Sequence, residues 1–336
     1  NAEYIDNISL EQINISGKSY VGSTIGDTNE QYITNINGKD IEIKGNGNYV
    51  GGIIGRLAWS DYSHYPYTKN INIENATISG KIYVGGILGY GRIYYLQASD
   101  VNVEGTYYVG GISGYAYSKN GWSNIANSEI KGTESYIGGI AGYHDGVYDC
   151  DVNNCKILGT GANSSYIGGI GGTLERDAVG CSVVNSVIEG NGTNIGGIHG
   201  YRCGARQSFV YNTEITGYSN VGGVIGELTT YNGEVSNCYV NVKIEAISNN
   251  IGGLVGYANN INANGVNVVI ANQSAVYNSV IEGKNNVGGI IGEIAEKPQD
   301  ITWFYRNYVE AKIYGDEGST SLGIGSNEQY NSLLED

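Results

Sequence analysis

The stretch Tyr83-Val84-Gly85-Gly86-Ile87-Leu88-Gly89-Tyr90 decides the fold, because close copies of it recur along the whole chain. Spacings between copies run from 25 residues (Gly85 to Gly110) to 36 residues (Gly252 to Gly288). Periods in this range are typical of solenoids, propellers and other repeat arrays. Further glycine pairs stand at Gly51-Gly52, Gly138-Gly139, Gly168-Gly169, Gly196-Gly197 and Gly222-Gly223, with a degraded copy at Val21-Gly22-Ser23 and a last echo at Leu322-Gly323-Ile324-Gly325.

A second pattern precedes each copy and predicts strands. A single glycine, such as Gly80 or Gly132, stands ahead of the glycine pair, and the residue two places before it is apolar in every unit, as at Ile78 and Ile130. The residue four places before it is small or aliphatic, as at Ser128. This alternation with period two predicts a strand that buries one face.

Asparagine stands five residues before this register glycine in seven units, and Asp40 and Asp100 stand there in two more. Asparagine tolerates a left-handed backbone and bonds to neighbouring peptide groups, so it suits a tight bend between two strands. Stacked coils would place these amides in a hydrogen-bonded ladder. The seven are Asn75, Asn127, Asn154, Asn185, Asn212, Asn241 and Asn278.

These patterns predict an all-β fold, a right-handed parallel β-helix of about 11 coils of roughly 30 residues, each with three short strands. One unit would hold strands at residues 71–73, 77–79 and 83–88. A propeller blade needs about four antiparallel strands in about 40 or more residues, and the handedness follows from the chirality of parallel crossovers. Because such units contact only their neighbours, residues 1–336 are predicted to form one solenoid domain without a separate catalytic domain.

The first residue of the repeated phrase changes from tyrosine to asparagine halfway along the chain. In-register stacking would give an aromatic ladder that passes into an amide ladder at Asn194, Asn220, Asn250 and Asn286. Such ladders stabilise stacked coils, and an aromatic strip could also contact sugar faces or another protein. The tyrosines are Tyr20, Tyr49, Tyr83, Tyr108, Tyr136 and Tyr166.

Loops that leave the phrase vary in length, and in solenoids such insertions often cluster on one binding face. Aromatic residues with a polar tip are enriched at binding hot spots, although packing of the loops against the rod would use the same residues. The candidate binding residues are Trp59, Tyr62, His64, Tyr65, Tyr94, Tyr95, Trp122, Trp303 and Tyr305.

Two of the five cysteines share a register. Cys150 and Cys181 both stand nine residues before their register glycine, so we expect them on adjacent coils, either as a disulfide or as two buried free thiols. Cys155 falls at the small inward position and is expected in the core.

The charge and hydropathy of the chain limit the kinds of partner that it could bind. The 18 basic and 33 acidic side chains give a net charge of −15, which argues against nucleic acid, because its binding rests on neutralising phosphates. No run of apolar residues is as long as a membrane-spanning helix requires, which is about 18 residues. The start at Asn1, without a signal sequence or initiator methionine, favours a processed or excised segment.

Motifs for chemistry are missing from the sequence. His-Glu-x-x-His is absent, and the glycine phrase lacks the carboxylate of calcium-binding Gly-Gly-x-Gly-x-Asp repeats. We therefore expect no enzyme activity, no metal and no cofactor. The isolated histidines are His64, His144 and His199, and the only charge cluster suited to a polysaccharide-cleaving cleft, or simply to a solvated surface, is Arg202 and Arg206 with Glu175, Arg176 and Asp177.

The phrase Val-Gly-Gly-Ile-x-Gly-Tyr, followed by a variable loop and Asn-x-x-Ile-x-Gly, resembles the GLUG-repeat family of bacterial surface proteins. Its core matches Gly86-Ile87-Leu88-Gly89, Gly139-Ile140-Ala141-Gly142 and Gly253-Leu254-Val255-Gly256. The resemblance implies a large secreted or wall-attached protein, such as an adhesin-like protein or the non-catalytic region of an IgA-cleaving zinc metallopeptidase.

The first function hypothesis is a non-enzymatic extracellular rod that spaces, adheres or assembles at a bacterial cell surface. Alternating Ile5, Ile8 and Ile13 start the first coil, and an open rung is a template for pairing. We therefore expect end-to-end stacking with a second copy or with further coils of a parent chain. The alternatives are a carbohydrate-binding or polysaccharide-cleaving β-helix, and the accessory region of a secreted zinc metallopeptidase. A glycan or a host surface protein is the other partner expected.

Overall fold

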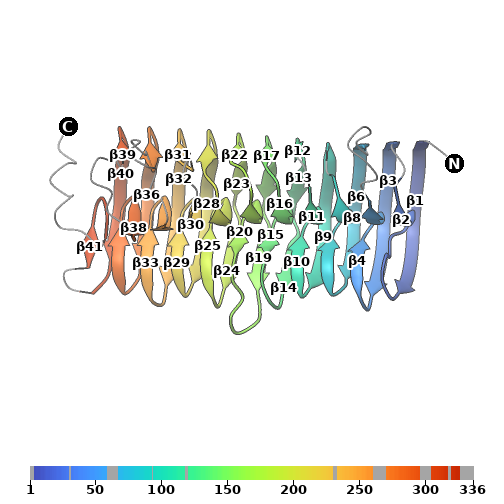
Figure 1. The fold of residues 1–336 in the computed structure, drawn as a ribbon, viewed down its shortest axis with the longest axis horizontal. Helices are drawn as coiled ribbons and strands as arrows, with labels where there is room; N and C mark the ends of the chain where they lie inside the picture. The colour runs from blue at the N-terminus through green and yellow to red at the C-terminus, as the bar shows by residue number, and fades with distance from the viewer. Residues whose placement is uncertain are drawn as a thin grey trace.

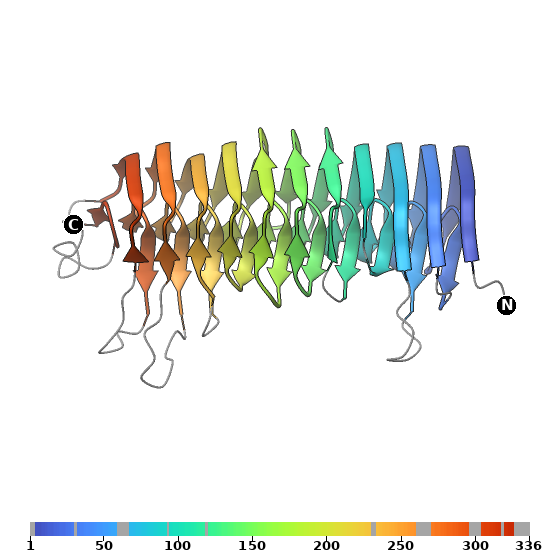
Figure 2. The same cartoon turned by 90° about the horizontal axis from the view of Figure 1, so that it is seen from above.

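The computed structural model describes residues 4–29, 32–58, 67–92, 94–117, 120–229, 233–259, 270–295, 304–316 and 319–325. These residues form a rod of stacked parallel strands, with β1 (Tyr4–Gly17) and β41 (Thr320–Ser321) at its two ends (Figures 1 and 2). No helix in the described ranges is long and apolar enough to cross a membrane.

Four sheets run along the rod. Sheet 1 has 14 strands. They are β1, β3 (Tyr32–Gly45), β6 (Tyr67–Ser79), β9 (Leu96–Gly105), β13 (Asn124–Ala126), β14 (Glu129–Gly132), β18 (Asp151–Asn153), β19 (Lys156–Gly159), β23 (Ser182–Val184), β24 (Val187–Gly190), β28 (Phe209–Gly217), β32 (Tyr239–Ala246), β36 (Ala275–Glu282) and β40 (Tyr308–Tyr314).

Sheets 2 and 3 have ten strands each. Sheet 2 holds β4 (Asn48–Gly51), β7 (Ile82–Gly85), β10 (Tyr107–Gly110), β15 (Ile137–Gly138), β20 (Ile167–Gly168), β25 (Thr193–Gly196), β29 (Ser219–Gly222), β33 (Asn249–Gly252), β37 (Asn285–Gly288) and β41. Sheet 3 holds β2 (Ile25–Thr28), β5 (Ile54–Leu57), β8 (Leu88–Gly91), β11 (Ser113–Ala116), β16 (Ala141–His144), β21 (Gly171–Leu174), β26 (His199–Arg202), β30 (Ile225–Leu228), β34 (Val255–Ala258) and β38 (Ile291–Ile294).

Sheet 4 has seven short strands. They are β12 (Asn120–Gly121), β17 (Val147–Tyr148), β22 (Ala178–Val179), β27 (Ala205–Arg206), β31 (Val235–Ser236), β35 (Ala271–Asn272) and β39 (Phe304–Tyr305). Pairing is parallel throughout the described strands and keeps equivalent residues in register, as in Ile15 opposite Ile43 and Gly85 opposite Gly110. The predicted parallel β-solenoid is therefore confirmed, with about ten turns, close to the predicted 11 coils.

The glycine-pair stretch differs from the expected single strand at residues 83–88. It forms β7 and β8 in two different sheets, because the chain turns between them. A Cβ on Gly85 would lie 2.2 Å from the carbonyl oxygen of Leu88, and one on Gly86 would lie 2.0 Å from the carbonyl oxygen of Gly111 in the next coil. Backbone therefore occupies the space that any side chain would need.

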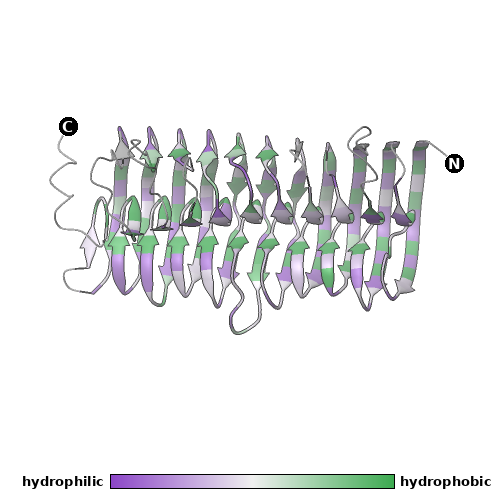
Figure 3. Ribbon diagram, in the orientation of Figure 1, coloured by the Kyte–Doolittle hydropathy of each residue, from purple (hydrophilic) through white to green (hydrophobic). Residues whose placement is uncertain are grey.

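The core is a column of apolar side chains inside the coils. The position two residues before the register glycine is at most 1% exposed in nine successive units, from Ile43 to Ile281. Figure 3 shows hydrophobic and hydrophilic residues alternating along the long strands of sheet 1. Each such side chain contributes about 1.5–3 kcal/mol when fully buried, so this column is a main source of stability.

Buried hydroxyls join the coils where the backbone bends. Ser128, which follows the bend at Asn127, donates to the carbonyl of Ala126 (2.6 Å) and accepts from the amide of Val101 (3.1 Å) in the preceding coil. A buried amide without a partner would cost free energy, so the hydroxyl completes the ladder at the corner. Ser123, Ser186, Ser208, Ser274 and Ser279 make the same pair of bonds at other bends.

Candidate functional site

The tyrosines that open the repeated phrase form one file along a corner of the rod. Neighbouring rings are stacked, with centroids 4.9 Å apart for Tyr20 and Tyr49, 4.7 Å for Tyr108 and Tyr136, and 5.0 Å for Tyr136 and Tyr166. All six tyrosines have a positive φ, between 52° and 66°. Tyr49, Tyr83 and Tyr108 lie within short strands of sheet 2, as the sequence pattern predicted for Tyr83, and the structure adds that all six tyrosines are left-handed corner residues.

A second tyrosine file lies beside the first. Tyr90, Tyr115 and Tyr143, from the last position of the phrase, stack with centroid distances of 5.0 Å and 4.2 Å. Tyr90 also meets Tyr83 edge to face at 5.8 Å. Burial raises the pKa of Tyr83, Tyr90 and Tyr115, so their hydroxyls stay protonated to a higher pH than that of an exposed tyrosine.

Asparagine continues the corner in the C-terminal half. The side-chain amide of Asn220 donates to Asn194 (2.8 Å), that of Asn250 to Asn220 (3.0 Å), and that of Asn286 to Asn250 (2.9 Å). Glu227 lies against this file, and burial raises the pKa of its carboxyl, although bonds from Asn194 and Asn220 act in the opposite direction. The stacked tyrosines and the hydrogen-bonded asparagines therefore occupy the same corner on successive coils and form one continuous file.

The asparagines at the other bend form a less regular file. Six of the seven have φ between 45° and 52°. Side-chain amides connect Asn154 to Asn127 (2.9 Å) and Asn212 to Asn185 (2.8 Å), and that of Asn75 to the carboxylate of Asp40 (2.6 Å), but that of Asn185 reaches Asn153 instead (3.4 Å).

Asn241 departs from the expected bend. The Cα of this residue lies opposite Tyr211, while Val242 lies opposite Thr213, so Asn212 bulges without a Cα partner in β32, although its backbone amide donates to the Oδ1 of Asn241 (3.3 Å). The coil of β32 is one residue short at this corner. Asn241 therefore bonds outward, to the carbonyl oxygens of Tyr277 (3.2 Å) and Asn278 (3.3 Å) of the next coil.

Three of the predicted binding aromatics meet in one cluster. Tyr95 and Trp122 stack with centroids 5.1 Å apart, and Tyr94 packs edge to face on both. Tyr95 is 36% exposed and Trp122 is 41% exposed. Trp59, Tyr62, His64, Tyr65 and Trp303 lie outside the described residues, and of Tyr305 only the backbone, in β39, is described.

Cys150 and Cys181 are neighbours on adjacent coils, since the residues that follow them pair in register. Both are buried free thiols, so the structure has the free-thiol alternative and not the disulfide. Burial raises the pKa of Cys181, and the adjacent Cys150 adds to this effect. Cys155 lies in the core as expected, and burial raises its pKa to about 11.

Two of the three histidines are buried inside the rod, and the predicted charge cluster is made of ion pairs at the surface. His144 and His199 are fully buried, and burial lowers their pKa values to about 3 and about 4. Within the described ranges no cluster of three or more His, Cys, Asp or Glu residues could hold a metal ion. The charge cluster consists of surface ion pairs between Arg202 and Glu175, Arg206 and Asp177 (2.7 Å), and Arg176 and Asp145 (3.2 Å).

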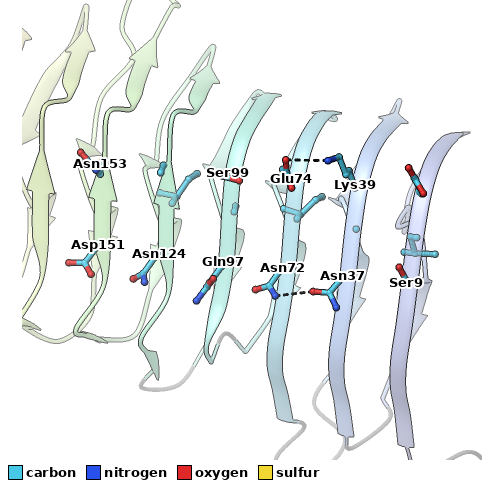
Figure 4. Close-up of a pocket in the computed structure, with 17 residues that line it drawn as sticks. Ser9, Asn37, Lys39, Asn72, Glu74, Gln97, Ser99, Asn124, Asp151 and Asn153 are labelled. Atoms are coloured by element: carbon cyan, nitrogen blue, oxygen red, sulfur yellow. Dashed lines mark hydrogen bonds and ion pairs between the residues drawn. The ribbon is translucent and has the colours of Figure 1, made fainter.

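The outer face of sheet 1 contains a feature that the sequence patterns did not indicate. A groove of about 810 Å³ crosses the strands from β1 to β18. Figure 4 shows its side chains in two rows, one with Asn37, Asn72, Gln97 and Asn124, and the other with Lys39, Glu74 and Ser99. These outward positions vary between units, so a search for shared residues overlooks them.

Comparisons with known proteins agree with the repeat. The model of the GLUG motif matches residues 217–245, which run from Gly217 at the end of β28 through β29 and β30 to Glu245 in β32. Neither curated proteins nor solved structures gave a match. The matched segment is one coil of the described stack, so at least this coil of the β-solenoid carries the GLUG motif.

Proposed function

We propose that this chain is a non-enzymatic structural rod of an extracellular surface protein, and that its coils stack end to end on a second copy or on further coils of a longer chain. The extracellular location rests on the resemblance to GLUG-repeat surface proteins. The stacking rests on the first described coil.

The observation that carries the proposal is the loss of burial at β1. Ile5, Ile8, Ile13 and Ile15 are only partly buried, whereas their partners Ile33, Ile36, Ile41 and Ile43 in the next coil are at most 2% exposed. In the described residues, β1 has a hydrogen-bonded neighbour on one side only. One more coil on this edge would bury the same column that every interior coil buries.

The edge also lacks the usual protection against pairing. Proteins protect edge strands with proline, lysine, bulges or short length. β1 is 14 residues long and reads YIDNISLEQINISG, with neither proline nor lysine. Its edge is therefore a suitable template for another parallel coil.

The test compares inward and outward lysines in β1. Ile8→Lys with Ile13→Lys places charges in the apolar column, whereas Glu11→Lys changes an exposed side chain of the same strand. Sedimentation and electron microscopy should show end-to-end assemblies for the wild type and Glu11→Lys, and monomers for the double variant. Circular dichroism checks that all three keep their strands. A wild-type chain that stays monomeric at every concentration rules out self-stacking.

A further inference from the structure

We propose that the outer face of sheet 1 binds an extended, uncharged polysaccharide laid along the rod axis. The face is bounded by the two bends of each coil and presents two outward positions per coil, two residues apart. It combines the groove of Figure 4 with an aromatic strip in the C-terminal coils. The proposal goes beyond the structural role and uses none of the contacts at the rod ends.

The groove offers hydrogen-bonding groups of both kinds at each step. Asn37, Asn72, Gln97 and Asn124 are in register on successive coils. An amide side chain both donates and accepts, as sugar hydroxyls require. The amide of Asn72 donates to Asn37 (2.9 Å), while the buried Oδ1 of Asn124 has no partner among the described residues.

Aromatic rings border the groove and continue the face. Tyr95 and Trp122 stand two residues before Gln97 and Asn124, at the bend that bounds the groove. Further along the same two rows, Phe209, Tyr211, Tyr277 and Tyr308 are 42% to 55% exposed. An exposed aromatic patch with a polar border marks a binding surface, and pyranose rings pack their C–H faces on aromatic rings.

The spacing selects the kind of polymer. Coils repeat every about 4.8 Å, which is comparable to the length of one pyranose unit in an extended glycan. An extended peptide rises about 3.3 Å per residue, so it does not match this step. Tyr239 lies between Tyr211 and Tyr277, with ring centroids 6.5 Å and 6.3 Å away. These rings are farther apart than those of the tyrosine file along the corner of the rod.

Charge excludes anionic polymers. In the groove, the ammonium of Lys39 lies 3.5 Å from the carboxylate of Glu74, and Glu11 and Asp151 leave a small negative surplus. The whole chain carries a net charge of −15. Nucleic acids and uronic-acid polymers would be repelled, whereas a neutral glycan is not.

The experiment titrates the whole chain with β-1,4-linked oligosaccharides of glucose, mannose and N-acetylglucosamine, using calorimetry and the change in tryptophan fluorescence that depends on Trp122, identified by comparison with Trp122→Phe. Affinity for at least one series should rise with length up to about six units, because the groove spans six strands from β1 to β18. Oligogalacturonate provides the anionic comparison. Absence of binding by every neutral series, or binding of oligogalacturonate alone, overturns the proposal.

Paired variants locate the site. Gln97→Ala with Asn124→Ala should weaken binding of a six-unit chain about tenfold or more, and Tyr211→Ala with Tyr277→Ala should weaken binding of the polymer, which is long enough to reach the C-terminal coils, by a similar factor. Tyr107→Ala with Tyr218→Ala removes two tyrosines that are 37% and 47% exposed outside this face, and should leave affinity unchanged. Equal losses in all three double variants, or no loss in the first two, contradict the assignment. Thermal unfolding shows that each variant is folded.

Discussion

A tyrosine in the left-handed region is an unfavourable residue choice, yet six of them line one corner of this rod. The conformation costs about 1–2 kcal/mol per residue, and each aromatic contact returns about 0.5–1.5 kcal/mol. An interior ring such as Tyr108, stacked on both Tyr83 and Tyr136, has two such contacts. Because each contact is shared by two rings, stacking offsets only part of the strain, and this part is largest where the file is continuous.

Substitutions of Ser128 test the role of the buried hydroxyls at the bends. Ser128→Ala removes the acceptor of the buried Val101 amide, so we expect a loss of about 1–3 kcal/mol in the free energy of unfolding. Ser128→Cys should cost less, because Cys155 occupies the equivalent place in the next coil and its thiol bonds the carbonyl of Asn153. Denaturant unfolding measures both, and Ser16→Ala on the exposed surface is the control. Equal stability of Ser128→Ala and wild type would contradict the role.

His144 should make the protein sensitive to acid. Its folded pKa of about 3 lies below the about 6.5 of an unfolded histidine. Below pH 6.5 the unfolded state binds more protons, so stability falls as the pH decreases toward the folded pKa, by up to about 1.4 kcal/mol per pH unit. The melting temperature of His144→Leu, which removes the unpartnered Nε2, should rise relative to wild type as the pH falls from 7 to 4.5.

The control for this pH series is Lys156→Gln, which changes an exposed side chain and should keep the wild-type pH dependence. A difference between His144→Leu and wild type that does not vary with pH would show that burial of the neutral imidazole is not the cause.

At the scale of the strand, the repeat makes some features predictable and hides others. The buried column and the left-handed bends recur in most units, so Ile78 and Asn75 could be placed from spacing alone. The split of the glycine pair into β7 and β8 could not, because it depends on backbone of the neighbouring coil. The face of sheet 1 was missed because Gln97 and Phe209 fill equivalent outward positions with different chemistry.

Asn220 separates backbone strain from side-chain bonding in the amide file. It has φ 53° and its side chain bonds with Asn194, Asn250 and Glu227. Asn220→Gly keeps the easy left-handed backbone and loses these three bonds, so we expect a cost of about 1–3 kcal/mol. Asn220→Ala adds the left-handed penalty of about 1–2 kcal/mol. Chemical denaturation should rank wild type above Gly and Gly above Ala; equal Gly and Ala variants would contradict the assigned strain.

At the scale of the whole molecule, each coil contacts its neighbours and little else. Stability should then be close to a sum over coils and interfaces. Excision of residues 190–216 removes one complete coil and joins Glu189 to Gly217, which occupies the place of Gly190. The shortened chain should fold with unchanged circular dichroism per residue, and X-ray scattering should show a rod shorter by about 4.8 Å.

The control for this excision removes a segment that is not a whole repeat, residues 203–216. That deletion joins Arg202 at the end of β26 in sheet 3 directly to Gly217 ahead of β29 in sheet 2, so this coil loses its strands in sheets 4 and 1 and the order of the sheets is broken. If both deletions fold equally well, the coil is not the cooperative unit.

The direction of the hydrogen bonds has a mechanical consequence. Bonds between parallel strands of successive coils run along the rod, so tension applied to its two ends loads the coils in series. The end coil is hydrogen-bonded to a neighbouring coil on one side only, so it unfolds first. The next coil, which has the same architecture, then becomes the new end of the rod. A chain stretched in this way would lengthen in regular steps at nearly constant force. It would absorb work as each coil unfolds in turn, instead of breaking in one event.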